Sequence, residues 1–372
     1  MDNENTLTVL HTHSVIELFY TLYPFLLSNI QEKRVKFIYF KPEKLDTISG
    51  KNVLFLRIFK GRFDDTKFVN STLKQLKNSF ENVFFLDDSA GADSTHFEFI
   101  DSIDGYYKAK LLSNKKTYNK TIYGRHVFSD YYHHHFKITD DEMESYRNPV
   151  DSFQETEKLK TAFNVGYGWY PNPSKSNFLK YFVKLLARTN NFQLIRPLFL
   201  NQHRKLIDTL DDPINFHSKQ LKVSARFRYQ SYPNSIGYQR FLFEKIIKNH
   251  QSFLTGIVSP KKYLDEQKQT FATLSPFGYG EVCIRDFECI INGSLLIKPD
   301  MSHVVTQPNI YIPNETYIPV KWDGSDLLDV VDNVLSNTKY YQSVAENART
   351  IYRKSLINIE SEFMSVFGAL LN

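Results

Sequence analysis

The residues that could do chemistry gather in one segment in the second half of the chain, residues 274–300. An apolar, strand-like run ends at Leu274, a glycine-rich turn follows over 278–280, and a helix is expected to begin at about Glu281. Glycines allow a backbone to approach a ligand closely, and a helix N-terminus offers unpaired N–H groups to an anion. Gly293 stands where a glycine ends such a helix. The segment predicts a site for an anionic ligand.

Charged residues share one face of this expected helix. Glu281, Arg285 and Glu288 occupy positions i, i+4 and i+7, which lie on the same side of an α-helix. Two carboxylates and a guanidinium next to a glycine turn suit a charged, polyhydroxylated ligand. Polar residues just after the next predicted strand are further candidates, because ligands of parallel sheets bind at that end; they are Lys298, Asp300, Ser302 and His303.

Arginines follow the first strand of the second half. Arg226 and Arg228 alternate along a strand predicted over 223–227, so they point to opposite faces and at most one reaches a cleft. Arg240 stands near the beginning of a helix predicted over 238–249. Guanidinium groups bind phosphate oxygens in pairs and stabilise the charge of a departing diphosphate without a metal. No Asp-X-Asp triplet occurs in the chain, and we expect neither a metal nor a cofactor.

Polar loops also follow two predicted strands of the first half. His13 follows a strand over 6–10, and Asp88 follows a strand over 83–86. A histidine oriented by an aspartate can remove the proton of an acceptor hydroxyl, so both are candidate catalytic residues. Three consecutive histidines, 133–135, suggest a metal, but consecutive residues cannot converge on one ion in regular structure. We expect a structural or surface role for them.

Strand and helix signals alternate in both halves and indicate what positions these residues. A helix with a Ser-X-X-Glu capping box is expected over 14–29 and another over 68–80, and a loop with two glycines and two prolines, 164–174, separates the halves. Continuous apolar strands between helices are typical of parallel sheets covered on both faces. The predicted strands are 6–10, 36–40, 53–58, 83–86, 223–227, 253–258, 271–274, 294–297 and 317–320. We predict an α/β protein of two Rossmann-like, doubly wound domains that face a cleft.

Length and composition agree with two globular domains. The chain has 372 residues, 42% of them hydrophobic, with 46 Lys+Arg against 41 Asp+Glu and a formal net charge of +5. Domains average roughly 150 residues, and this composition excludes a disordered or fibrous protein. The basic excess is thin for a nucleic-acid-binding protein. Nucleic acid is therefore not an expected partner.

The cysteines and the N-terminal residues bear on location. Cys283 and Cys289 do not share a helix face, so we expect them to be reduced and the protein to be cytoplasmic. We see no signal peptide, and the most apolar segment, 15–30, contains Glu17 and Pro24 and falls short of the ~20 apolar residues of a span. We expect no transmembrane segment, while peripheral contact with a membrane stays open.

The segment that opens this section resembles the donor-binding helix of GT-B glycosyltransferases of the group-1 type, glycosyltransferase family 4 and its relatives. That pattern is a Gly-Phe-Gly-like turn, a helix carrying Glu, a glycine five residues later and an apolar strand. Here it reads Phe277-Gly278-Tyr279-Gly280, then Glu288, Gly293 and the run 295–297. The run from Arg285 to Glu288 is similar to spore-coat and to viral or bacterial polysaccharide transferases. The family has seven residues between its two glutamates, whereas Glu281 and Glu288 have six.

The resemblance implies the transfer of a sugar from a nucleoside diphosphate, UDP by family frequency, to a hydroxyl group of a glycan. It implies a hexosyltransferase that retains anomeric configuration without a metal, with an acceptor domain over 1–200, a donor domain over 201–356 and a helix over 357–372 that packs back on the first domain. Glu281 would be catalytic and Glu288 would bind the ribose hydroxyls. The expected donor-binding residues are Arg226, Arg228, Arg240, Gly278, Tyr279, Gly280, Arg285, Glu288, Lys298, Asp300, Ser302 and His303.

Two alternatives stay open. Because Gly280 stands where the first glutamate of the family is expected, the chain could be a binding module for a nucleotide sugar or a glycan, without catalysis. The second alternative is an enzyme that inverts the anomeric configuration, in which His13 and Asp88 supply the base.

Overall fold

The first half of the chain forms a six-stranded, fully parallel sheet in the order β2-β1-β3-β4-β5-β7. The structure is a computed structural model that describes residues 7–28, 34–124, 126–141, 157–171 and 177–371. The strands are Leu7–His11 (β1), Val35–Tyr39 (β2), Gly50–Phe55 (β3), Phe80–Asp87 (β4), Gly105–Lys108 (β5) and Leu159–Thr161 (β7). The chain leaves β1 for β2 on one side and returns to β3 on the other. The switch point of this sheet therefore lies between β1 and β3.

Both faces of this sheet are covered, as its apolar strands require. Leu7 and Val9 on β1 belong to one hydrophobic core and Leu10 to the other, which is the alternation of a strand buried on both sides. Helix α3 (Thr66–Ser79) packs against one face. On the other lie the π-helical turn η1 (Glu17–Thr21), α1 (Tyr23–Leu27) and two helices from later in the chain, α7 (Phe192–Asp211) and α13 (Ile359–Phe367).

The second half repeats the architecture with a five-stranded parallel sheet in the order β13-β11-β10-β8-β9. Its strands are Gln220–Ser224 (β8), Phe253–Leu254 (β9), Thr270–Leu274 (β10), Leu295–Pro299 (β11) and Ile318–Val320 (β13), and its helices are α8 (Asn234–Ile247), α9 (Pro260–Gln269), α10 (Ile284–Ile291) and α11 (Leu327–Ser336). The chain leaves β8 for β9 on one side and returns to β10 on the other. The switch point lies between β8 and β10.

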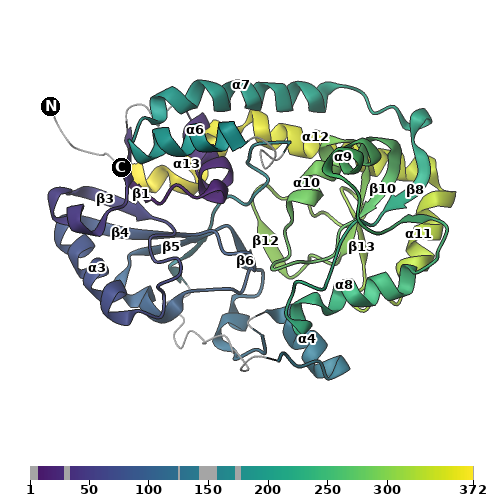
Figure 1. Ribbon diagram of the computed structural model, residues 1–372, viewed down its shortest axis with the longest axis horizontal. Helices are drawn as coiled ribbons and strands as arrows, with labels where there is room; N and C mark the ends of the chain where they lie inside the picture. The colour runs from purple at the N-terminus through teal and green to yellow at the C-terminus, as the bar shows by residue number, and fades with distance from the viewer. Residues whose placement is uncertain (1–6, 29–33, 125, 142–156, 172–176, 372) are drawn as a thin grey trace.

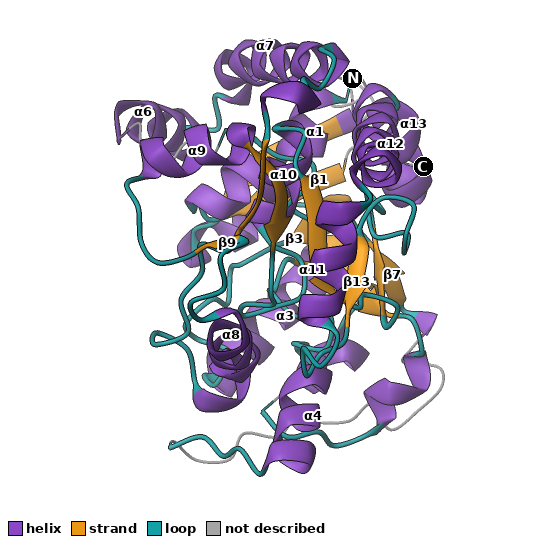
Figure 2. Cartoon of the chain, turned by 90° about the vertical axis from the view of Figure 1, so that its right-hand side faces the viewer, coloured by secondary structure: helices purple, strands orange, loops and turns teal. Residues whose placement is uncertain are grey.

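Long helices and a short ribbon join the halves (Figures 1 and 2). α7 and α12 (Thr338–Ile357) pack against each other across the top of the molecule in Figure 1, next to α6 (Asn177–Arg188). β6 (Lys110–Leu112) from the first half pairs with β12 (Val304–Thr306) from the second in an antiparallel ribbon. The C-terminal helix returns to the first half, where Phe363 and Phe367 pack on Phe25.

The structure confirms the predicted pair of doubly wound, Rossmann-like domains, the GT-B arrangement, with a C-terminal helix that crosses back. The capping box also forms, because Glu17 N–H bonds to the Ser14 hydroxyl and Ser14 N–H to the Glu17 carboxylate. The domain boundary expected at residue 200 falls inside α7, which contacts elements of both halves. Within the described residues, none of the helices combines the length and the apolar character that crossing a bilayer requires.

Two sequence predictions that bear on the site need correction. β8 ends at Ser224, so Arg226 and Arg228 lie in the loop after the strand and not on it. α10 begins at Ile284, so Glu281 precedes the helix and does not share its face. Asp286 accepts a hydrogen bond from Cys283 N–H, and this reciprocal cap sets the helix start three residues later than expected. Helix α4 (Val127–Phe136) lies between β6 and β7 along the chain.

Candidate active site

A cavity of about 560 Å³ opens at the switch point of the second sheet. Its walls are the loop after β8, the loop after β10, the first residues of α10, parts of α8 and α9, and Ala90 from the first half. Ala90 belongs to the loop after β4, so the cavity lies between the two domains. The residues predicted to bind a donor that line it are Arg226, Arg228, Arg240, Gly278, Tyr279, Gly280, Arg285 and Glu288.

The two glycines of the turn after β10 stand where no side chain fits. A Cβ on Gly280 would come within 1.8 Å of the Ala90 carbonyl oxygen, and one on Gly278 within 2.9 Å of the Arg240 guanidinium. Gly280 thus allows the two domains to approach each other closely at the Ala90 loop, and Gly278 lets Arg240 reach the cavity wall. Tyr279, between them, is 53% exposed and packs on Tyr232, with ring centroids 4.7 Å apart.

Three of the four arginines around the cavity keep their charge available to a ligand. Arg240 is buried and held in place by the carbonyls of Phe277 and Arg228. Arg285 donates one hydrogen bond to the Arg226 carbonyl at 2.9 Å, while its buried Nε and Nη1 have no partner among the described residues. The Arg228 side chain is exposed at the cavity wall. Buried donors without a partner are rare in native structures, which makes the Arg285 guanidinium a candidate for contact with a ligand.

Arg226 is different, because the protein already neutralises it. Its guanidinium contacts the Glu266 carboxylate with Nε at 2.9 Å and Nη2 at 2.6 Å, and Nη1 bonds to the Thr255 carbonyl. The prediction that at most one of Arg226 and Arg228 reaches a cleft is wrong, because neither lies on the strand and both line the cavity. Of the two, Arg228 is the one whose charge the protein does not already neutralise through Glu266.

Glu288 is the one carboxylate among the residues described as lining this cavity. It accepts a hydrogen bond from the Tyr263 hydroxyl of α9 at 3.3 Å. Tyr20, from the first domain, lies near it: burial raises the pKa of Tyr20, and the charge of Glu288 raises it further. Tyr263 and Tyr20 were not singled out in the sequence, because no local pattern distinguishes them from the many core tyrosines.

Glu281 is buried at the contact between the domains and does not line the cavity. Its Oε2 accepts a hydrogen bond from Ala92 N–H at 3.0 Å. Its Oε1 lies 3.8 Å from His303 Nε2, an ionic contact too long for a hydrogen bond. Burial would raise the pKa of Glu281, but His303 and then His126 outweigh burial and hold it at about 2. Glu281 therefore links the two domains as an ionised group.

The sequence placed Lys298 after the strand, but it lies within β11, and none of the four polar residues expected there lines the cavity. Lys298 is fully buried and pairs with Asp286, whose Oδ2 lies 3.1 Å from its Nζ. Asp300 and Ser302 bond to each other at 2.5 Å. The His303 ring packs on Trp322, with centroids 4.8 Å apart. Lys298, Asp300, Ser302 and His303 therefore lie apart from the donor-binding candidates that line the cavity.

The expected pairing of His13 with Asp88 does not form. Asp88 accepts hydrogen bonds from Arg57 Nε at 2.7 Å and from the Thr21 hydroxyl at 2.5 Å. His13 packs on Tyr39, with ring centroids 5.1 Å apart. Its pKa is lowered by burial and by the neighbouring charges of Arg188 and Lys184. Both residues follow strands of the first sheet as predicted, but each has other partners.

Sequence reasoning missed a buried basic residue close to Glu281. Lys110 on β6 donates a hydrogen bond to the Ser89 carbonyl at 2.8 Å. Burial, followed by the charge of Lys108, lowers its pKa to about 8, although Glu281 opposes that shift. The strand that carries Lys110 has only three residues, and Lys110 itself pairs with Thr306, 196 positions away. No local pattern could have predicted it.

The histidines 133–135 lie on α4 and have separate partners. His133 Nδ1 contacts the Ile138 carbonyl, His134 pairs with Asp130, and His135 Nδ1 contacts the Tyr131 carbonyl. Across the described residues, no group of three or more His, Cys, Asp or Glu side chains is arranged to hold a metal ion.

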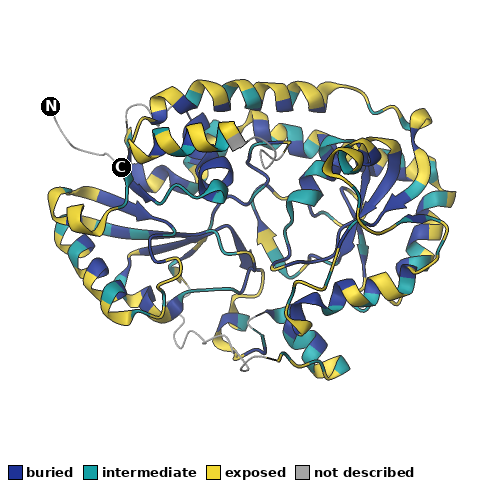
Figure 3. Ribbon diagram, in the orientation of Figure 1, coloured by how far each residue is buried: buried dark blue, intermediate teal, exposed yellow. Residues whose placement is uncertain are grey.

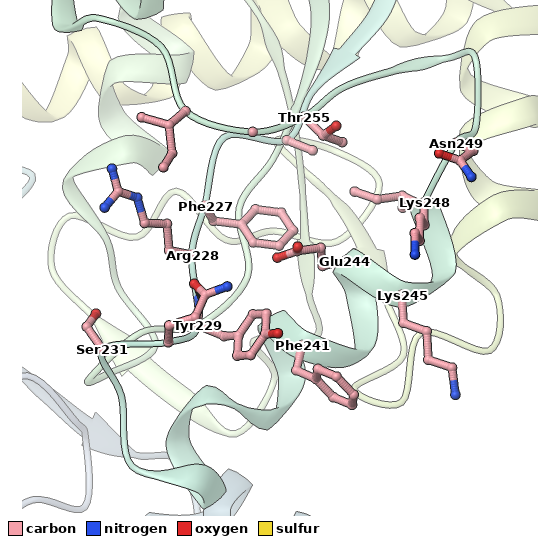
Figure 4. A pocket seen from close by; sticks show the side chains of 15 residues that line it. Phe227, Arg228, Tyr229, Ser231, Phe241, Glu244, Lys245, Lys248, Asn249 and Thr255 are labelled. Atoms are coloured by element: carbon pink, nitrogen blue, oxygen red, sulfur yellow. Dashed lines mark hydrogen bonds between the residues drawn. The ribbon is translucent and has the colours of Figure 1, made fainter.

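A second, larger cavity of about 820 Å³ lies beside the first. The two share Phe227, Arg228 and the residues 256–257. In Figure 4, the side chains of Phe227 and Glu244 project into the larger cavity. The Arg228 side chain extends away from these two. Its other described lining residues come from α8, including Lys245, from the loop after β8 and from the loops on either side of β9. None of them comes from the first domain.

No protein-family model matches the sequence. No curated protein sequence matches it either. Similar solved structures include a glycosyltransferase from Rickettsia africae, with 9% identity, both chains covered in full and a TM-score of 0.48. Others are an alpha-glucosyltransferase in complex with UDP-glucose and DNA containing an abasic site (9% identity, 99% of each chain, TM-score 0.46) and Anabaena HepE in complex with UDP-glucose (8% identity, 98% of this chain and 99% of that one, TM-score 0.43). The two-domain assignment rests on the strand order described above.

Proposed function

We propose that the protein transfers a sugar from a nucleoside diphosphate, UDP in the first instance, to a hydroxyl group of a glycan. The observation that carries the proposal is the interdomain cavity with three available arginines, Arg228, Arg240 and Arg285, against one carboxylate, Glu288. A diphosphate supplies the negative charge that balances this excess. The hydroxyls of a ribose or a sugar are donors that suit Glu288.

The arginines would stabilise the leaving group. When the bond from the anomeric carbon to the diphosphate breaks, the electron pair stays on the diphosphate, and the acceptor oxygen forms the new bond. Guanidinium groups already fixed in place stabilise the departing charge without reorganisation. Arg240 is fixed by two carbonyls and Arg285 by one. The N-terminus of α10 lines the same wall and adds its dipole.

The acceptor would enter from the first domain, whose Ala90 loop closes the cavity. We propose retention of configuration, in which no protein base has to take the acceptor proton. The described lining residues are consistent with this, since they include no histidine and no carboxylate other than Glu288. An inverting reaction through His13 and Asp88 has less support, because each is held by other residues. We also propose a metal-independent reaction, in which arginines carry the role of a cation.

One observation favours a second candidate function, a nucleotide-sugar-binding module without catalysis. Glu281, expected at the sugar, lies outside the cavity and links the domains instead. A binding module needs the arginines and Glu288 but no group at the reacting carbon. The two functions share the donor site and differ in turnover.

Incubation with a panel of nucleoside-diphosphate sugars tests the proposal, with free nucleoside diphosphate measured by chromatography, with and without glycan acceptors. An enzyme releases the diphosphate even by slow donor hydrolysis. Glu288→Gln should weaken donor binding by about tenfold or more, since hydrogen bonds to a charged group contribute roughly 1.5–3 kcal/mol. Glu244→Gln, in the neighbouring cavity, is the matched control.

The outcomes separate the two functions. Release of diphosphate supports the transferase. Binding that depends on Glu288, without release from any donor, supports the module. Absence of binding by every donor would refute both.

A further inference from the structure

Helix α6 has an apolar stripe that the described part of the chain leaves exposed. Of the thirteen large apolar side chains that are exposed among the described residues, six lie between residues 178 and 198. Phe178 is 80% exposed, Tyr181 69% and Leu185 49%. Figure 3 shows the exposed surfaces of α6 and α7, and Figure 2 shows α6 at the edge of the molecule. An exposed, contiguous apolar surface usually marks a binding site.

The stripe is separate from the helix face that packs on the core. Phe178, Tyr181, Phe182 and Leu185 are spaced by three or four residues and therefore share one side of the helix. Phe178 and Phe182 stack with nearly parallel rings. The core contact is made by other residues, such as the buried Val183 and Ala187. Packing of the helix on the protein does not explain the exposed side.

A row of basic residues flanks the stripe. Lys180, Lys184 and Arg188 are spaced by four residues, so they run along the helix next to the apolar side. No acidic residue occurs within α6. The charges of Arg188 and Lys184 reach the loop after β1, where they lower the pKa of His13. A short helix with an uncovered apolar side and a basic flank has the design of an interfacial membrane helix.

We propose that α6 docks the protein on an anionic lipid surface. The apolar stripe would enter the boundary between headgroups and acyl chains, and the basic row would contact the anionic headgroups. The basic row favours a lipid surface over a second copy of the chain as the partner of α6. A second copy of the chain would bring the same positive row against itself, whereas an anionic bilayer is complementary to it. Leu194 and Leu198, exposed on the adjoining α7, extend the apolar surface.

Flotation with vesicles tests the proposal on the full chain. The protein should float with vesicles that contain phosphatidylglycerol and much less with vesicles of phosphatidylcholine alone, and high salt should reduce flotation. The double variant Phe178→Ser/Tyr181→Ser should lower the partition constant by about tenfold or more, because it removes two large apolar side chains from the surface that would enter the bilayer. Tyr340→Ser/Ile357→Ser, which removes two exposed apolar residues from α12, is the matched control and should leave flotation unchanged.

Two further variants keep the test independent of folding. Arg188→Glu should weaken binding to anionic vesicles by about tenfold, whereas Lys77→Glu, at the exposed end of α3, should not. Phe178→Trp keeps the stripe apolar, and its fluorescence should shift to the blue with vesicles and be quenched by lipids brominated in the acyl chain.

Three results would overturn the proposal. The first is no flotation with anionic vesicles. The second is flotation that the α6 variants do not change relative to their controls. The third is a dimer in light scattering that Phe178→Ser/Tyr181→Ser dissociates while vesicles do not bind, which would make α6 an interface between copies of the chain.

Discussion

Gly280→Ala is the substitution that tests the closed contact between the domains. The new Cβ would lie 1.8 Å from the Ala90 carbonyl oxygen, and the lower limit of ordinary contact is 3.4 Å. The Ala90 loop therefore has to retreat by about 1.6 Å. The hydrogen bond from Ala92 N–H to Glu281, now 3.0 Å, belongs to the same contact and would be stretched beyond bonding range. The substitution separates the wall of the cavity that comes from the first domain from the walls that come from the second.

Both stability and turnover should fall. Forced overpacking of this kind destabilises by about 1–3 kcal/mol, and a misplacement of about 1 Å at a reacting centre reduces turnover by roughly a hundredfold. Donor binding should change much less, because the arginines all lie on the second domain. Urea unfolding, calorimetric titration with a nucleoside diphosphate and donor turnover measure the three quantities.

Gly50→Ala is the matched control, because its Cβ would meet the Phe80 ring at 3.4 Å, an ordinary contact. The account of a closed interdomain contact is refuted if Gly280→Ala unfolds at the same urea concentration as Gly50→Ala and turns over donors equally fast.

Other residues give sharper tests of single contacts. Arg285→Met should weaken nucleoside diphosphate binding by about tenfold to a hundredfold in calorimetry, because it removes two buried donors that lack partners; equal affinity would contradict this assignment. Lys298→Met should lower the free energy of unfolding in urea by about 3–5 kcal/mol, because it leaves the Asp286 carboxylate buried without a cation, and a loss below 1 kcal/mol would mean that the hydrogen bonds from Ser275 and Tyr311 suffice for that carboxylate. The pKa of Glu281 is depressed to about 2 in the folded protein from a usual 4.5, so its contribution to stability is present above pH 4.5 and is lost as the pH falls towards 2. Glu281→Gln should flatten the stability profile in that range, and an unchanged profile would contradict the role of the ionised group.

The fold could be predicted from the sequence because its signals are local. β1 and β4 are apolar runs that are buried over most of their length, and α3 shows helical spacing between them. The capping box at Ser14 and Glu17 marks the first helical turn, as the hydrogen bonds show. Such patterns do not depend on partners elsewhere in the chain.

The site could be predicted in part. The glycine turn and Arg240, Arg285 and Glu288 do line one cavity, because the order of strands and helices fixes which loops meet. The site predictions that failed concern residues whose partners lie far away in the sequence. Glu266 neutralises Arg226 from 40 positions away, and Arg57 and Thr21 hold Asp88. Local sequence does not encode which charge is already paired.

The ribbon of β6 and β12 was missed for the same reason. Each strand has three residues, too few for a periodic signal, and they pair across the two domains. Glu281 was misplaced because a cysteine stands in the cap position, where serine, threonine or aspartate is usual, although the Cys283 and Asp286 backbone and side-chain contacts form.

The central claim is that the arginine-lined cavity between the domains binds a nucleoside diphosphate. A crystal structure with UDP tests it most directly. The account predicts phosphate oxygens within hydrogen-bond distance of Arg285 and of Arg228 or Arg240, with a ribose hydroxyl on Glu288. Phosphates beside Lys245 in the larger cavity, or UDP bound elsewhere on the protein, would contradict it.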